Sequence, residues 1–203
     1  MKVEQLQELM KDLNDKNIIK DILENIDDES IDVYLFLKKE YVKKNVNINY
    51  LFQFVYRSFY RLDNAGLTPE FKTKYFELMS TQNCDLKNIL ESLLPYKTRR
   101  NLYSVQFSFA TKLMNTLNPD LPIYDSRVRK ILKLKGHYDK YPNNRIKKCI
   151  LIYDDLKLNV DYLLKQNLKI ISYFRDKFNV PKKQMNNLKI LDFVLWSYGD
   201  IKK

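Results

Sequence analysis

The sequence predicts an all-α, multi-helix fold. Apolar residues recur at helical spacing along almost the whole chain, and no stretch alternates apolar and polar residues as a half-buried strand would. Hydrophobic residues make up 45% and aromatic residues 13% of the 203 residues, which is enough to fill a core without cross-links. We expect residues 1–203 to form a single all-α domain, or two packed helical halves with a seam near residues 82–98.

Six apolar stripes predict the helices of the N-terminal half of the chain. Ser30 is expected to cap the third helix, and Thr68 followed by Pro69 is the usual order at the start of the fifth. Gly66 and Pro95 are expected to end the helices that precede them. The stripes lie in residues 6–13, 18–26, 33–41, 48–62, 69–80 and 86–93.

Residues 100–117 predict a central helix that is enclosed on nearly all sides, because its apolar residues form two stripes rather than one. We expect Phe107 and Phe109 to pack in the interior, since aromatic residues at this spacing usually fill a core. Asn118 and Pro119 end this helix. One stripe consists of Leu102, Val105, Phe109, Leu113 and Leu117, and the other of Tyr103, Phe107, Ala110 and Met114.

The C-terminal part of the chain predicts a polar loop followed by long helices. The loop covers residues 135–144 and contains His137, to which we assign no catalytic role because a single histidine in a basic loop is usually at the surface. A helical tract over residues 146–178 is expected to break near residues 158–159. Trp196 is expected to anchor a last helix in the core.

Asp125 stands where a helix should begin. It follows a linker fixed by Pro122 and precedes an apolar and basic helical repeat. A side-chain oxygen at this position accepts hydrogen bonds from the unpaired amides of the first turn, and the negative charge is favoured by the positive end of the helix dipole. We therefore predict that Asp125 is an N-cap.

The net charge of +11 is distributed unevenly. Residues 1–32 hold ten acidic and four basic side chains, so the rest of the chain carries a net charge of +17. Residues 97–149 contain thirteen Lys and Arg against three Asp, which makes the segment around Asp125 the most basic one. This coincidence favours a polyanionic partner such as nucleic acid, and the alternative is a Lys-rich solvated surface.

The order of elements around Asp125 resembles the core of the helix-hairpin-helix DNA glycosylase superfamily. The shared segment of that superfamily ends in Pro-Val-Asp-(Thr/Ser)-x-Val-x-Arg, and here it reads Pro122-Ile123-Tyr124-Asp125-Ser126-Arg127-Val128-Arg129, with Tyr124 as an extra residue. Together with residues 189–199, this core is similar to a distant oxoguanine-glycosylase-like branch of bacterial proteins. The resemblance covers residues 94–135 and implies a helix-hairpin-helix glycosylase fold.

The resemblance implies a role for each matched residue. Asp125 would be the catalytic carboxylate, which stabilises the sugar cation or activates water after a base has been flipped out of the duplex. Ser108 takes the approximate place of the amine nucleophile of bifunctional members, and a hydroxyl cannot form an imine, so the implied enzyme is a monofunctional glycosylase without lyase activity. The residues expected to bind the nucleic-acid backbone are Lys97, Arg99, Arg100, Arg127, Arg129 and Lys130.

Residues 94–100 correspond to the hairpin of the superfamily but contain no glycine. A hairpin whose amides approach a phosphate closely favours glycine, so the lysine and the two arginines of this segment are expected to act as point charges instead. The candidates for an aromatic ring that stacks on the flipped base include Tyr56, Tyr60 and Tyr124.

Other kinds of site are disfavoured. Cys84 and Cys149 lie far apart and the chain has one histidine, so neither a zinc site nor a disulfide framework is indicated, and we expect no metal and no cofactor. The first residues lack the apolar core of a signal peptide, and no stretch reaches the length of a membrane span. We expect a cytoplasmic protein without a membrane partner.

Three functions remain open. The first is a DNA-binding, monofunctional base-excision glycosylase that acts on double-stranded DNA. The second is a catalytically inactive relative that retains the fold and the binding of nucleic acid. The third is a protein-interaction scaffold whose basic surface meets an acidic partner.

Overall fold

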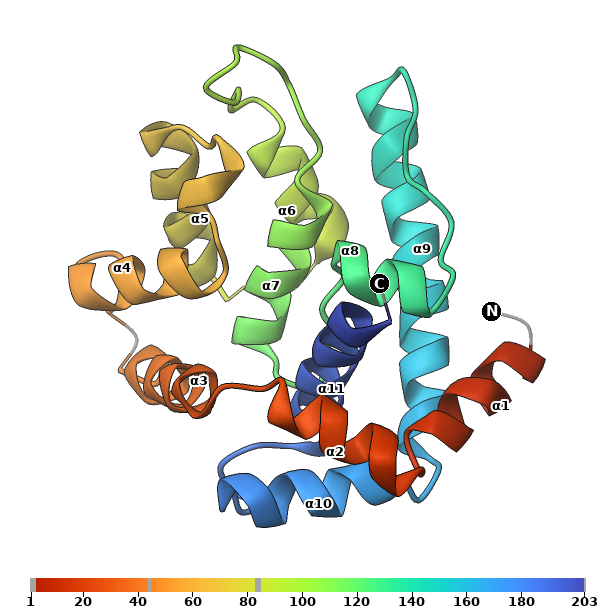
Figure 1. Ribbon diagram of the computed structural model, residues 1–203. Coiled ribbons are helices and arrows are strands. Elements are labelled where there is room, and N and C mark those ends of the chain that lie inside the picture. Colours follow the sequence, from red (N-terminus) through yellow and green to blue (C-terminus); the bar gives the residue numbers. More distant parts are fainter. Residues whose placement is uncertain (1–2, 44, 83–84, 203) are drawn as a thin grey trace. The chain divides into compact units, whose positions relative to one another are not determined.

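The structure is a computed structural model in which residues 3–43, 45–82 and 85–202 are described. These residues form eleven α-helices and one short 3-10 helix, and among them no strand is present, only an isolated bridge between Leu67 and Thr98 (Figure 1). The predicted all-α class is confirmed. None of the helices in this part of the chain combines the length and the apolar character that a membrane span needs.

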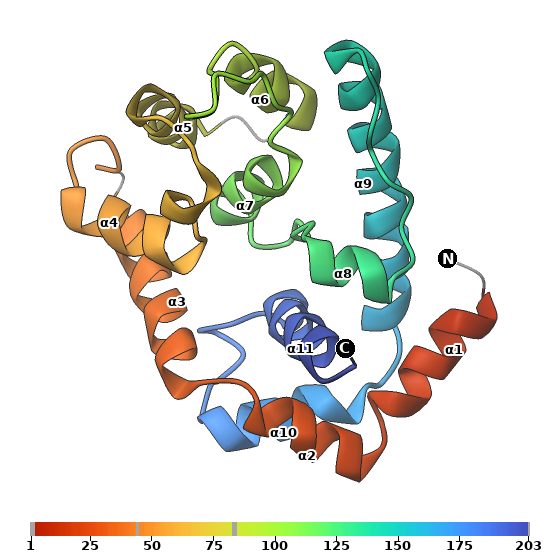
Figure 2. The same cartoon turned by 45° about the horizontal axis from the view of Figure 1, so that its top comes forward.

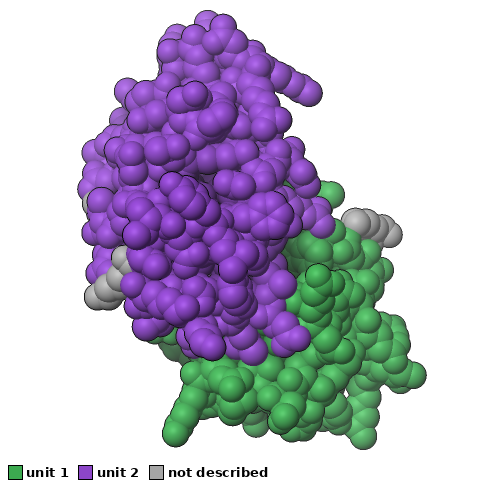
Figure 3. Space-filling view, turned by 90° about the vertical axis from the view of Figure 1, so that its left-hand side faces the viewer, with its two compact units in different colours: residues 1–31, 119–136, 151–203 green, residues 32–118, 137–150 purple. Residues whose placement is uncertain are grey.

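The helices form two compact units, which Figure 3 shows in different colours. Each unit draws on distant parts of the sequence. Unit 1 contains the described residues of 1–31, 119–136 and 151–203, and unit 2 contains those of 32–118 and 137–150.

The chain does not divide at residues 82–98, where the sequence predicted a seam. These residues fall inside unit 2, because helix α6 (Leu86–Leu93) packs against both α5 (Pro69–Ser80) and α7 (Phe107–Leu117). Helix α6 does end shortly before Pro95, as predicted, but the chain then returns to the same unit.

Helix α11 (Asn187–Ile201) is the centre of unit 1. It packs against α2 (Lys16–Glu24), α8 (Ser126–Ile131) and α10 (Lys169–Phe178), and nine of its fifteen residues are buried. The fully buried Ser197 donates a hydrogen bond to a carbonyl oxygen of α2 at 2.8 Å. The other helices with residues in this unit are α1 (Val3–Asp12), α3 (Asp28–Tyr41) and α9 (Pro142–Leu164), of which α3 and α9 contribute to both units.

Helix α7 has the same role in unit 2. Seven of its eleven residues are buried, including Phe107 and Phe109, which confirms the predicted enclosed helix. Two fully buried tyrosines connect it to its neighbours: Tyr56 of α4 (Tyr50–Phe59) lies within hydrogen-bond distance of a threonine hydroxyl of α7, and Tyr75 of α5 donates to the carbonyl oxygen of Phe109 at 2.9 Å. Burial raises the pKa of both tyrosines far above the usual value, so both hydroxyls keep their protons.

The helix predicted over residues 100–117 begins later, at Phe107. The residues before Phe107 form a loop, and Leu102 and Tyr103, which were predicted to lie in its apolar stripes, are exposed. Asn101 has a φ of 61°, a left-handed conformation that a right-handed helix does not contain.

Backbone hydrogen bonds hold this loop against the turn before α5. The amide of Arg99 donates to the carbonyl oxygen of Gly66 at 2.7 Å, next to the bridge between Leu67 and Thr98. The amide of Thr98 donates to the carbonyl oxygen of Leu102 at 2.9 Å. Pairing between backbone groups of distant segments therefore replaces the helical bonds that the local pattern predicted.

Only part of the stripe predicted for α4 is buried: its members Phe52 and Leu62 are buried and others are exposed. Phe52 and Tyr56 are in the core, whereas Ile48 and Leu51, from the predicted stripe, are exposed. Apolar and aromatic residues occur on nearly every side of this helix, so its periodicity does not select one face. Tertiary contacts decide which face is buried.

The predicted start of α5 is confirmed, and that of α3 is not. The Thr68 side chain accepts a hydrogen bond from the amide of Phe71 at 3.3 Å, and Pro69 is the first helical residue. Helix α3 begins at Asp28, so Ser30 lies in its first turn rather than before it.

The break predicted near residues 158–159 lies further along the chain. Helix α9 continues to Leu164, and α10 begins only at Lys169. The side chain of Asn159 donates to the carbonyl oxygen of Asp155 at 2.7 Å, one turn earlier in the same helix. The side-chain amide of Asn159 therefore has a hydrogen-bond acceptor within the helix, and the helix continues past it.

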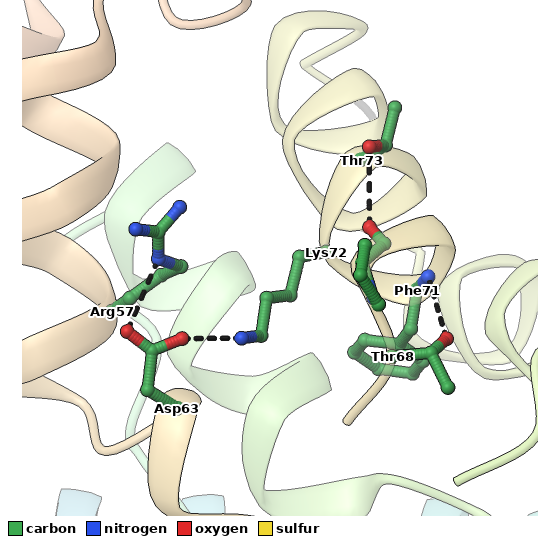
Figure 4. Close-up of polar contacts among 7 residues, drawn as sticks. Arg57, Asp63, Thr68, Phe71, Lys72 and Thr73 are labelled. Atoms are coloured by element: carbon green, nitrogen blue, oxygen red, sulfur yellow. Dashed lines mark hydrogen bonds and ion pairs between the residues drawn. The ribbon is translucent and has the colours of Figure 1, made fainter. Parts of the chain in front are cut away.

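Asp63 joins α4 to α5 through two cations (Figure 4). It lies in the short 3-10 helix η1 (Asp63–Ala65), and its carboxylate forms ion pairs with Arg57 of α4, at 3.3 Å, and with Lys72 of α5. Burial on its own would raise the pKa of Asp63, but the hydrogen bond from Lys72 and the charge of Arg57 lower the pKa below its usual value.

We expect Asp63→Asn to reduce the acid sensitivity of the fold. A carboxylate with a lowered pKa stabilises the folded state fully above the pKa it has in the unfolded chain, about 4, and this contribution is lost as the pH falls towards the folded value. The effect should be below about 1 kcal/mol, because 41% of the side chain is exposed and its charge is screened. Urea unfolding at pH 7 and pH 3 measures it.

The difference in unfolding free energy between the two pH values should be smaller in Asp63→Asn than in the wild type. Glu91→Gln is the matched control, since Glu91 lies 3.8 Å from Lys87 on the exposed side of one helix. An equal pH dependence in Asp63→Asn and the wild type would contradict this role of Asp63.

Candidate nucleic-acid interface

Asp125 caps helix α8, as predicted. Its backbone is extended, with φ −140° and ψ 176°, and its Oδ1 atom accepts hydrogen bonds from the amides of Arg127 at 2.8 Å and Val128 at 2.9 Å. The side chain is half-buried. The carboxylate therefore satisfies two amides that the first turn of a helix leaves unpaired, and its charge lies at the positive end of α8.

Arg127 ties α8 to α11. Its guanidinium lies 3.6 Å from the centre of the Trp196 ring and forms an ion pair with Asp200. A Cβ on Gly199 would stand 3.0 Å from the Cβ of Arg127, so glycine permits the close approach of the two helices. Trp196 is 36% exposed and covers the guanidinium, so the prediction that it is a core anchor is wrong. The charge of Arg127 is already matched inside the protein.

Four further cations follow Arg127 along α8 and the segment after it. Three of them are exposed lysines, and the fourth, Arg129, is half-buried. Leu132 and Leu134 are buried between the lysines, which turns the lysine side chains outward. No carboxylate occurs in residues 126–136. We call this group the α8 strip, and it consists of Arg129, Lys130, Lys133 and Lys135.

An apolar recess in unit 1 adjoins the Asp125 motif. Pro122 and Ile123 line it on one side, and residues of α8, α9 and α11 line the remainder. Its one charged lining residue is Asp192, which pairs with the buried ammonium of Lys189 at 2.7 Å. Asp125 does not line the recess, so the recess is a feature of the packing around α11 and not a base pocket built on Asp125.

Unit 2 carries a second group of cations on the loop before α7. Arg99 and Arg100 are exposed, and Lys97 is half-buried with its ammonium 5.0 Å from the centre of the Tyr103 ring. Residues 94–106 contain no carboxylate. The three cations predicted for the glycine-free hairpin therefore lie together on one loop.

The residues before α9 contact the first residue of α7, which follows this loop. The ring of His137 packs edge-on against Phe107, the first residue of α7, with 5.6 Å between the ring centroids. Asp139 accepts hydrogen bonds from the ammonium of Lys148 at 2.9 Å and from the amide of Tyr141 at 3.0 Å, and these bonds lower the pKa of Asp139. The carboxylate of Asp139 is thereby engaged in holding the turn.

The other predicted site residues are placed by the packing of each unit. Ser108 is half-buried on α7 and belongs to unit 2, whereas Asp125 belongs to unit 1. Tyr56, Tyr60 and Tyr124 are all buried. Their rings are in the interior, so none of these three candidates presents a face for a base at the surface.

Three exposed tyrosines were not predicted as binding residues, and one of them, Tyr103, was expected in an apolar stripe of the central helix. Tyr103, Tyr138 and Tyr141 all lie in polar segments that are rich in Lys and Arg. The sequence does place each of these tyrosines near a cation. Tyr103 closely follows an arginine pair, and Tyr138 and Tyr141 flank an Asp-Lys dipeptide before a proline. Periodicity predicted burial for Tyr103 because it assigned residues 100–106 to a helix, whereas these residues form a loop.

Two further features of the described ranges concern metal-ligating groups and thiols. No group of three or more His, Cys, Asp and Glu side chains that could hold a metal ion occurs there. Cys149 is buried, and burial raises the pKa of its thiol to about 12, so the thiol stays protonated. Cys84 lies outside the described residues.

Comparison of the chain with protein-family models, with curated proteins and with solved structures finds no match. The geometry and charge of its own residues are therefore the basis of the function proposed below.

We expect Asp125→Ala to lower the free energy of unfolding more than Asp125→Asn does. Asp125→Ala removes the acceptor for two amides and should lower the free energy of unfolding by about 1 kcal/mol. Asp125→Asn keeps a capping oxygen, so its loss should be only a few tenths of the loss in Asp125→Ala. Urea unfolding of both variants at pH 7 measures the difference. Equal losses in the two variants would show that the cap does not depend on the side-chain oxygen.

Proposed function

We propose that this protein binds nucleic acid, double-stranded DNA in particular, mainly through its phosphates. The observation that carries the proposal is the α8 strip, in which four cations follow one another without an intervening carboxylate. Lys and Arg that neutralise phosphates release condensed counterions, and this release supplies most of the affinity of sequence-independent binding. The cations at residues 97–100 of unit 2 provide a second such group.

Arg127 is not assigned to the phosphates. Its guanidinium is stacked on Trp196 and paired with Asp200, so its charge is already opposed by a carboxylate of α11. The exposed lysines of the α8 strip have no such structural task, and they are the residues on which the binding can be tested.

We expect the combined replacement of Lys130, Lys133 and Lys135 by Gln to weaken binding to all duplex sequences alike. Fluorescence anisotropy with a labelled 20-base-pair duplex, read at several salt concentrations, measures the affinity. The logarithm of the binding constant should fall with the logarithm of salt concentration, and the slope should become shallower by up to about 3 in the variant, because three phosphate contacts are lost.

A control variant with the same change in charge carries Lys165→Gln, Lys182→Gln and Lys183→Gln, all at exposed positions of unit 1. If both triple variants weaken binding equally, net charge and not the α8 strip explains the affinity. Absence of duplex binding by the wild type at low salt would overturn the proposal itself.

Base release is a second candidate function. It is favoured by the order of elements, since the enclosed helix α7, a linker with Pro122, and the capping Asp125 at the head of a basic helix follow one another along the chain. In this chemistry the bond between the base and C1′ of the sugar breaks, water adds its hydroxyl to C1′, and the proton of the water goes to the departing base. Asp125 would stabilise the positive charge that develops on the sugar.

Asp125→Asn separates catalysis from structure, because Asn keeps the shape and the capping oxygen but not the charge. We expect it to abolish base release from duplexes that each carry one modified base, 8-oxoguanine among them, while duplex affinity stays within about twofold of the wild type. Product analysis after alkaline strand cleavage detects the release. An active Asp125→Asn variant would remove Asp125 from the mechanism, and a protein–DNA adduct trapped by borohydride would contradict the monofunctional reaction.

A further inference from the structure

We propose that Tyr103, Tyr138 and Tyr141 form a stacking surface for the unpaired bases of a single-stranded nucleic-acid segment. This inference rests on the proposed function and adds to it the kind of strand that unit 2 recognises. Each of the three rings could cover the flat face of one base, as the exposed aromatic residues of single-strand binding proteins do.

The three rings are exposed to an unusual degree for aromatic side chains. Tyr138 is 80% exposed, Tyr141 61% and Tyr103 58%, whereas Tyr56 and Tyr75 in the same unit are fully buried. Large apolar groups gathered at one place on a surface mark sites of interaction more often than scattered ones do.

One ring contact, at the start of α7, joins the parts of the chain that carry these tyrosines. The loop with Tyr103 leads into Phe107, and the ring of Phe107 packs against His137, the residue directly before Tyr138. Both segments lie at the same end of unit 2, at the top of Figures 1 and 2, where the loop after α6 and the start of α9 are drawn. We call the two segments, residues 94–106 and 137–145, the tyrosine surface.

The backbone of each segment is held in place by hydrogen bonds. In the first, the bonds from Arg99 to Gly66 and from Thr98 to Leu102 fix the turn that precedes Tyr103. In the second, Asp139 accepts from the amide of Tyr141, and the ammonium of Lys148 donates to both the Asp139 carboxylate and the carbonyl oxygen of Tyr138, each at 2.9 Å. A stacking ring on a fixed backbone loses little freedom when it binds.

The charge around the rings selects an anionic partner. Lys97 stands over the ring of Tyr103 at 5.0 Å, and Lys140 over that of Tyr141 at 5.8 Å. Residues 94–106 and 137–150 together contain seven Lys and Arg against the single carboxylate of Asp139, which is already paired with Lys148. Phosphates beside a stacked base would meet these cations.

Unpaired strands fit this combination better than a duplex does. In a duplex the faces of the bases are stacked on one another, so exposed rings have no flat partner and only the cations contribute. In an unpaired strand every base offers a face, and stacking adds to the phosphate contacts without a requirement for sequence.

The test compares a variant in which the three tyrosines are replaced by Ala with one in which they are replaced by Phe. Anisotropy with a labelled 15-nucleotide dT strand should show a loss of at least about fivefold for each ring removed, hence about 100-fold in the Ala variant. The Phe variant keeps the rings and should bind within about threefold of the wild type. All three positions are exposed, and circular dichroism of both variants checks that the fold is kept.

A second Ala variant, at the exposed Tyr50, Phe54 and Tyr173, is the control for loss of aromatic surface elsewhere. If the tyrosine-surface Ala variant binds dT as the wild type does, or if the Phe variant fails together with it, the inference is overturned. Duplex binding by the wild type, measured in parallel, then shows that the proposed function survives. If the wild type binds neither strand nor duplex, both fail.

Competition with poly-glutamate distinguishes a nucleic-acid partner from an acidic protein. Poly-glutamate carries the charge of a nucleic acid without bases, so it should displace dT only at much higher charge concentration, and the Ala and Phe variants should bind it equally. Displacement at equal charge concentration would overturn the assignment to unpaired bases.

Discussion

The arrangement of unit 2 depends on a buried chain of hydrogen bonds through two tyrosine hydroxyls. The hydroxyl of Tyr56 lies 3.1 Å from that of Thr116 and 3.0 Å from that of Tyr75, which donates to the carbonyl oxygen of Phe109. Because Thr116 donates to the carbonyl oxygen of Lys112 at 2.9 Å and Tyr75 donates to Phe109, the single proton of Tyr56 goes to one of its two hydroxyl neighbours. A buried hydroxyl without a partner costs about 1–3 kcal/mol, so these hydrogen bonds fix α4 and α5 on α7. They thereby also fix Phe107, the first residue of α7, against which His137 of the tyrosine surface packs.

Polar groups in unit 1 also form hydrogen bonds and ion pairs within the protein. Asp125 accepts from two amides of its own helix, and Arg127 lies between Trp196 and Asp200, so the two most conspicuous charged residues of the motif hold α8 in place. A carboxylate can cap a helix and still act on a substrate, whereas the charge of the stacked guanidinium is already opposed by that of Asp200. The lysines around Leu132 and Leu134 are therefore the accessible part of the positive charge.

The sequence predicted those features that depend on neighbouring residues. The caps at Thr68 and Asp125 were found because an N-cap is decided within one turn of helix, and enclosure of α7 followed from its two stripes. The start of α7 was misplaced because the bond from Arg99 to Gly66 joins segments 33 residues apart, which no helical period reveals. The role of Trp196 was missed for a similar reason, since its partner Arg127 lies on another helix.

Exposed rings alone do not define the partner of a surface, because α4 also exposes Tyr50, Leu51 and Phe54. The one cation of α4 is Arg57, and it is paired with Asp63, so this face has apolar area but no available positive charge of its own. At the tyrosine surface the rings come with lysines over them and with arginines on the same loop. Apolar area without charge suits a neutral protein face, whereas rings and cations fixed on one backbone suit a partner that offers flat bases and phosphates at regular intervals.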